Sequence, residues 1–221
     1  MINNMSDYIN EKAGLKWITV FFAVVLLVVM GIIIWSLNKG FDFSDEAWYL
    51  LHLKGKISPV FYLSWFYIAQ LFYPQDIISI RIITLSLLIV GNVVFSFGIY
   101  HFFKHKLNNK LHLVNTIVLS IIGQLMFFVP NVFTPSYLTF NIIIITLGMG
   151  FYLLSFHRAN RCSENIFLFI SGFIFGLLPF IMITNSPFIL LLLIFIFLRD
   201  RTHKTYHYIS FIAGGLSTIA L

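Results

Sequence analysis

The sequence predicts an all-α bundle of membrane-spanning helices, a fold class supported by its composition and by the distribution of its charges. Hydrophobic residues make up 59% of the 221 residues, charged residues make up 10%, and the mean hydropathy is +0.93. Soluble domains carry roughly 25% charged residues, so this chain would expose large apolar patches to water. Its charges also lie in short stretches between long apolar runs. These features exclude a soluble enzyme, a disordered chain and a disulfide scaffold.

The first two spans are each predicted from one charge-free run. Residues 17–38 lie between Lys16 and Lys39, and residues 82–100 lie between Arg81 and His101. Crossing an apolar layer of roughly 30 Å takes about 20 helical residues. A cleavable signal peptide would have a shorter apolar core and a small-residue cleavage site. We therefore expect the first run to be a retained anchor helix.

Two longer runs are each predicted to form two helices. Residues 113–156 carry no charge and contain Pro130 and Pro135, which predict a break at 130–135 because proline cannot donate the helical hydrogen bond. Residues 165–198 contain a similar break at 185–187. The last segment, 208–221, is too short to cross and indicates an unfinished seventh helix. The prediction is six complete transmembrane helices and part of a seventh.

The basic residues predict the orientation. Ten of the fourteen fall on one side of this arrangement, and only Lys39, Lys54 and Lys56 fall in a loop on the other, with Arg81 at a helix end. Positive loops stay in the cytoplasm, so the N-terminus is predicted to be cytoplasmic and the protein integral to a bacterial plasma membrane. The clusters explain the net charge of +6 without a nucleic-acid partner.

The loop of residues 39–80 differs from the other connections. It holds half of the acidic residues, and residues 59–73 are rich in Phe, Trp and Tyr, which favours a helix in the membrane interface. Asp42, Asp45, Glu46 and Tyr49 are expected close together if Ser44 or Asp45 caps a short helix. Such carboxylates can act as a general base or hold a divalent cation. The alternative is that they are solvated loop charges.

The sequence also resembles a known family. A first helix, an outer loop with Asp45-Glu46 followed by Tyr49, and an aromatic interfacial segment resemble the GT-C superfamily of membrane glycosyltransferases. The branch is that of protein O-mannosyltransferases and the lipid A aminoarabinose transferase. Further similarities are found in the stretches Ile80-Arg81-Ile82 and Thr134-Pro135-Ser136-Tyr137-Leu138-Thr139, and in Gly172 and Gly176 followed by Asn185-Ser186-Pro187. Many relatives have Lys where this chain has Thr184 or Asn185, and family members are typically longer. Residues 1–221 thus resemble a single N-terminal transmembrane module of a larger enzyme.

The resemblance implies that a sugar moves from a polyprenyl-phosphate donor to a glycan, lipid or protein acceptor at the outer face. Asp45 would be the base, and Glu46 would position the acceptor or bind a metal. The donor phosphate would be held by Arg81, Lys54 and Lys56, and the substrate by Asp42, Tyr49, His52 and Tyr137.

The predicted site residues and the predicted function also have alternative interpretations. Arg81 could reach the interface by snorkelling, and Lys54, Lys56 and His52 could be solvated loop residues. Gly172 and Gly176 are predicted to allow close helix packing. The remaining histidines lack a metal-ligand spacing. The alternative functions are a transporter or flippase, which needs polar groups at mid-membrane depth, and a non-catalytic membrane subunit.

Overall fold

The computed structural model describes residues 2–36, 51, 77–106, 113–128, 137–156, 161–181, 189, 191, 192, 194 and 205–218. Within these residues the regular structure is helical and contains no strand, which confirms the all-α prediction. The elements are α1 (Ile2–Ser36), α4 (Ile77–Lys106), α5 (Leu113–Phe128), α6 (Tyr137–Ser155), α7 (Arg161–Gly176), α8 (Leu178–Ile181) and α10 (Thr205–Ser217).

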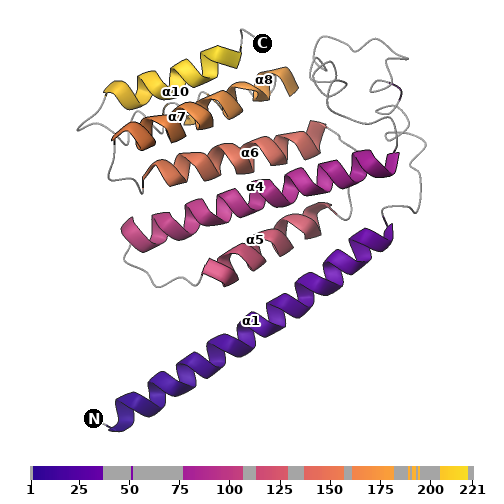
Figure 1. Ribbon diagram of the computed structural model, residues 1–221, viewed down its shortest axis with the longest axis vertical. Coiled ribbons are helices and arrows are strands. Elements are labelled where there is room, and N and C mark those ends of the chain that lie inside the picture. The colour runs from indigo at the N-terminus through magenta and orange to yellow at the C-terminus, as the bar shows by residue number, and fades with distance from the viewer. Residues whose placement is uncertain are drawn as a thin grey trace.

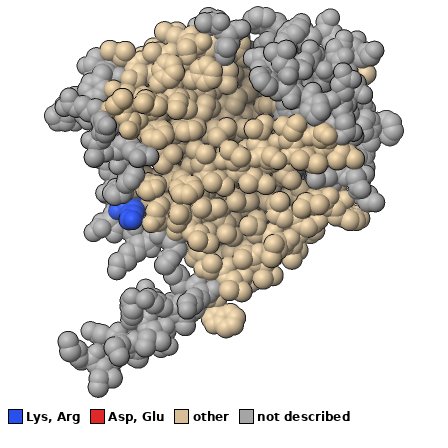
Figure 2. All heavy atoms as spheres, viewed as in Figure 1, with Lys and Arg blue, Asp and Glu red and all other residues tan. Residues whose placement is uncertain are grey.

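Three helical stretches are long and apolar enough to cross a membrane: Trp17–Ser36, Arg81–Lys104 and Cys162–Ile181. Large apolar side chains cover the outside of the helices, and Trp17 and Leu27 are 74% and 72% exposed. Figure 2 shows a surface with almost no charge over the described helices. Such a surface is stable against lipid and costly against water, so this is a membrane protein.

The helices extend beyond the charge-free runs that predicted them. The first span was predicted at 17–38, but α1 has 35 residues and begins at Ile2. The second was predicted at 82–100, but α4 has 30 residues and includes both Arg81 and His101. A charge limits burial in lipid without interrupting the backbone hydrogen bonds of a helix. Charged residues therefore mark where a span ends, and the helix continues past them.

The run of residues 113–156 contains two helices, as its prolines predict. These are α5 and α6, and the predicted break falls among residues 129–136, between them. In the run of residues 165–198, α7 and α8 account for the first predicted span. The break at 185–187 and most of the next span lie outside the described residues, as does the interfacial segment at 59–73. Helix α10 covers the beginning of the predicted seventh helix.

The helices lie side by side in the order α1, α5, α4, α6, α7, α10 (Figure 1). Glycines bring α4 and α6 close together: a Cβ atom at Gly98 would lie 2.7 Å from the carbonyl oxygen of Gly150, and one at Gly91 would lie 2.7 Å from Oγ1 of Thr146. Residue numbers rise together along this contact, so α4 and α6 run parallel. Small residues are the usual means of close helix approach in membranes.

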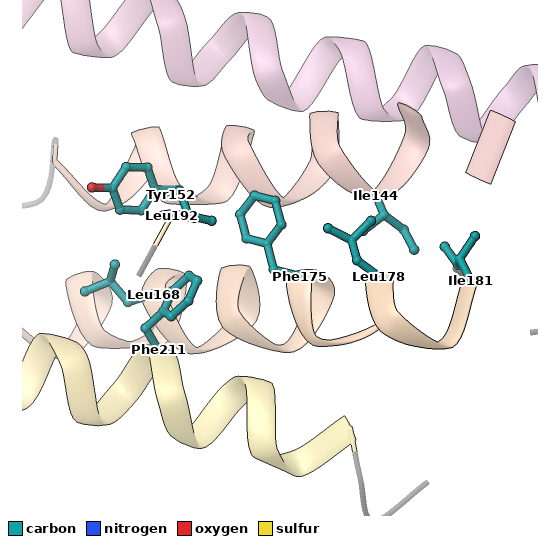
Figure 3. Close-up of a cluster of buried hydrophobic side chains, with 8 residues drawn as sticks. All are labelled: Ile144, Tyr152, Leu168, Phe175, Leu178, Ile181, Leu192 and Phe211. Atoms are coloured by element: carbon teal, nitrogen blue, oxygen red, sulfur yellow. The ribbon is translucent and has the colours of Figure 1, made fainter. Parts of the chain in front are cut away.

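Two clusters of buried apolar side chains hold the row together. One joins α1, α4, α5 and α6, and its buried members are Ile33, Leu85, Leu88, Ile121, Leu125 and Ile143. The other joins α6, α7, α8 and α10 (Figure 3), and its buried members are Ile144, Tyr152, Leu168, Phe175, Leu178, Ile181, Leu192 and Phe211. The ring of Phe175 fills the space that a side chain at Gly148 of α6 would otherwise occupy.

Candidate functional site

Arg81 lies inside the bundle, in the second turn of α4. It is 2% exposed, and polar residues at Thr84, Asn92 and Ser96 of the same helix are equally buried. A charged side chain is costly in an apolar layer unless polar groups or ions surround it. A guanidinium offers five N–H donors and binds phosphate or carboxylate through two of them at once. A buried arginine at this position therefore needs polar or anionic groups around it.

The start of α6 lies at the level of Arg81. The parallel contacts pair Gly91 with Thr146 and Gly98 with Leu153, and the same spacing places the first residue of α6, Tyr137, about level with Arg81. Thr139, two residues after Tyr137 in the first turn of α6, is buried at 3% exposure. The backbone of Tyr137 thus begins α6 at about the level of the predicted phosphate-binding arginine, while the tyrosine side chain lies outside what is described.

The other predicted site residues belong to the loop before α4. Chain connectivity joins that loop to α4 at Ile77, four residues before Arg81. Their positions lie outside the described residues, so the arrangement of the loop carboxylates around Arg81 stays a prediction. The residues concerned are Asp42, Asp45, Glu46, Tyr49, His52, Lys54 and Lys56.

A second group of polar side chains lies between α4 and α5. The Ser120 hydroxyl donates a 3.3 Å hydrogen bond to Oδ1 of Asn92. Nδ2 of Asn92 and both amide atoms of Gln124 are buried without a hydrogen-bond partner among the described residues. Gln124 follows Ser120 by one helical turn, so the two side chains lie on the same side of α5. Asn92 and Gln124 lie in separate apolar runs of the sequence, and no sequence spacing shows that they face a common interface.

A polar contact that the sequence did not predict joins α7 to α10. Nε2 of His207 lies 3.1 Å from Oε1 of Glu164, and the side chains are 6% and 18% exposed. Both residues lie near the start of their helices, where a carboxylate also interacts well with the helix dipole. Glu164 is the acidic residue in the first turn of α7, but no spacing in the sequence pairs it with His207.

Gly172 and Gly176 pack as the sequence predicted, against the backbone of α10. A Cβ atom at Gly172 would collide with the carbonyl oxygen of Phe211, and one at Gly176 would lie 2.7 Å from the carbonyl oxygen of Gly215. The Thr218 hydroxyl is 3.2 Å from the carbonyl oxygen of Gly176. These residues confirm the close-packing prediction, and they place α7 and α10 parallel.

Within the described part of the chain, no group of three or more His, Cys, Asp and Glu side chains is arranged to hold a metal ion. A search of protein-family models, curated proteins and solved structures finds no match for this chain. Arg81 and the loop that leads to it are therefore the features of this chain that bear on its function.

Proposed function

We propose that the protein is a membrane glycosyltransferase, or a module of one, that moves a sugar from a polyprenyl-phosphate donor to an acceptor at the outer membrane face. Arg81 would bind the donor phosphate and Asp45 would act as the base. The sequence resemblance described above supplies the substrate class. The burial of Arg81 is the observation that carries the proposal beyond that resemblance.

Arg81 and Lys104, near opposite ends of α4, differ in a way that supports a binding role for Arg81. Lys104 is exposed, and its Nζ lies 5.5 Å from the centre of the Tyr100 ring. This is how a basic side chain behaves when it reaches toward the interface. Arg81 is instead buried, at 2% exposure. A buried guanidinium favours an anion-binding role over snorkelling, since snorkelling would have brought the charge to water.

The proposed step needs one base and one anion-stabilising group. The Asp45 carboxylate takes the proton of an acceptor hydroxyl, and the acceptor oxygen then forms a bond with the anomeric carbon of the sugar. The bond between that carbon and the phosphate oxygen breaks, and polyprenyl phosphate leaves with the electron pair. Arg81 stabilises the charge that develops on this oxygen, which is the role in which preorganised donors contribute most to catalysis.

The test replaces each residue in the full-length gene product and measures sugar transfer from polyprenyl-phosphate donors in isolated membranes. We expect Arg81→Gln to lower transfer by about 100-fold or more, the usual effect of losing a donor to a developing anion, and Asp45→Asn to abolish it. Lys104→Gln is the matched control, because it removes a basic residue from the opposite end of the same helix, and it should transfer normally. An unchanged cellular glycan in the Asp45→Asn strain would remove Asp45 from the mechanism.

A further inference from the structure

Three polar side chains lie together at the contact between α4 and α5. The Ser120 hydroxyl donates its hydrogen bond to Oδ1 of Asn92 across this contact. Gln124 follows Ser120 by one turn on the same side of α5. We call Asn92, Ser120 and Gln124 the amide cluster. None of the three belongs to the predicted catalytic site.

The amide cluster lies near the middle of the membrane layer. Asn92 is about midway along the stretch of α4 from Arg81 to Lys104 that can cross a membrane, so it lies roughly 17 Å along the helix from each end. Its side chain is 2% exposed. Polar groups at this depth are costly in hydrocarbon unless they find hydrogen-bond partners.

The cluster has more hydrogen-bonding atoms than protein partners. Among the described residues, nothing bonds to Nδ2 of Asn92 or to Nε2 and Oε1 of Gln124, and all three atoms are buried. The nearby buried side chains of α4 and α5 are those of Leu88, Ile121 and Leu125, which are apolar and offer no hydrogen bond. Buried polar atoms in folded proteins are nearly always satisfied by protein or by ordered water. These three atoms therefore call for a ligand.

The unsatisfied atoms select a small neutral ligand that both donates and accepts hydrogen bonds. Each amide nitrogen carries two N–H donors, and Oε1 of Gln124 is an acceptor. A cation would leave the donors unused, and an anion would leave the acceptor unused. Either ion would also be buried without an opposite charge on residues 82–100 or 113–128, which contain no charged residue. Water is the smallest molecule that satisfies all three atoms.

The spacing of the two amides suits a single water. Gln124 lies about 6 Å along α5 from Ser120, the residue that contacts Asn92. A water with a hydrogen bond of about 2.9 Å on either side spans a similar distance. Buried waters typically make about three hydrogen bonds to groups that the protein leaves unpaired, and the cluster supplies three such atoms.

We propose that the amide cluster binds one water molecule in the middle of the membrane, held between α4 and α5 by the side-chain amides of Asn92 and Gln124. Ser120 orients the site, because its hydroxyl occupies Oδ1 of Asn92 and leaves Nδ2 for the water. Immobilising a water costs entropy, so an apolar side chain at 124 need not be less stable than the hydrated glutamine. The test therefore measures hydration directly. The proposal is independent of the glycosyltransferase function.

The test is nuclear magnetic resonance of the full chain in small phospholipid bicelles, with the glutamine side-chain amides labelled with nitrogen-15. The glutamines are at positions 70, 75 and 124, so the signal that Gln124→Leu removes is that of Gln124. In the wild-type chain we expect a rotating-frame Overhauser cross-peak between the Gln124 amide protons and water. Its sign separates a bound water from proton exchange. A Gln124 amide with cross-peaks to aliphatic protons only would overturn the proposal.

Variants of the other two residues test whether the water is shared. Asn92→Leu removes one of the two amides and should weaken the Gln124 cross-peak to water by about threefold or more, since a buried water needs several partners. Ser86→Ala is the matched control on α4, because the Ser86 hydroxyl is exposed and bonds within its own helix, and it should leave the cross-peak unchanged. Ser120→Ala covers the case in which Asn92→Leu fails to fold, because it keeps both amides and removes only the orienting hydroxyl, and it should also weaken the cross-peak. An undiminished cross-peak in either cluster variant would contradict a water held by both amides.

Discussion

The Nε2 atom of His207 lies 3.1 Å from the Oε1 atom of Glu164, and this contact ties the first turn of α10 to the first turn of α7. The same two helices meet further along at Gly172, whose Cα faces the carbonyl oxygen of Phe211 without room for a side chain. The contact between α7 and α10 therefore combines a histidine–glutamate pair at one end with backbone packing along its length. Each of these features gives a testable prediction.

Breaking the contact between His207 and Glu164 should loosen α10. We expect Glu164→Ala to lower the free energy of unfolding by about 1–3 kcal/mol, because His207 stays buried after its carboxylate is lost. The measurement is equilibrium unfolding in mixed micelles, as a double-mutant cycle with His207→Ala. The coupling between the two sites should exceed about 0.5 kcal/mol. Additive effects of the two replacements would show that the contact adds nothing to stability.

Adding a methyl group at the α7–α10 contact should also destabilise the fold. At Gly172 the methyl carbon of Gly172→Ala meets backbone atoms of Phe211, which cannot move aside as a flexible side chain can. We expect a loss of about 1–3 kcal/mol in unfolding free energy, as for other overpacked sites. Gly31→Ala of α1 is the control, since nothing lies within 4 Å of its Cβ position, and it should be neutral or slightly stabilising. Equal stability of the two variants would argue against this close approach.

Removing the amide of Gln124 should stabilise the protein. Both amide atoms are buried without a hydrogen-bond partner among the described residues, and an unsatisfied buried polar group costs about 1–3 kcal/mol. Gln124→Leu keeps a similar size and removes that cost, so the unfolding midpoint should rise. Asn92→Leu is the informative comparison, because it also removes the acceptor of the Ser120 hydroxyl and should gain less. A lower midpoint for Gln124→Leu would mean that the amide has a stabilising partner in the membrane.

Weakening the contact between α1 and α5 should free α1 without unfolding the rest. The Thr19 hydroxyl donates a 2.7 Å hydrogen bond to Oδ1 of Asn115, while much of α1 faces outward. Interhelical hydrogen bonds in membranes contribute about 0.6 kcal/mol on average. We expect Thr19→Val to raise amide exchange in α1 a few-fold and to leave exchange in α6 and α7 unchanged. Ser86→Ala is a suitable control, because the Ser86 hydroxyl bonds to the Ile82 carbonyl within its own helix.

Much of the helical structure follows from local features of the sequence. Apolar runs predicted α1, α4 and the division into α5 and α6, because a lipid-facing helix must be apolar for about 20 residues and proline interrupts it. The spacing of Gly172 and Gly176 predicted close helix packing, because only small residues allow two helix backbones to touch. The helix ends were predicted less well, because polar residues such as Arg81 and His101 end the apolar run without ending the helix.

The sequence by itself determined that this chain is a set of apolar helices in a membrane, because hydropathy and proline act locally along the chain. Only the tertiary structure decided which helices are neighbours, and hence that Arg81 is buried and that Glu164 meets His207. Almost every face of these helices is apolar, so hydropathy alone cannot identify the side that meets a neighbour. That choice depends on the fit of small residues and on the few polar groups that find partners across helices.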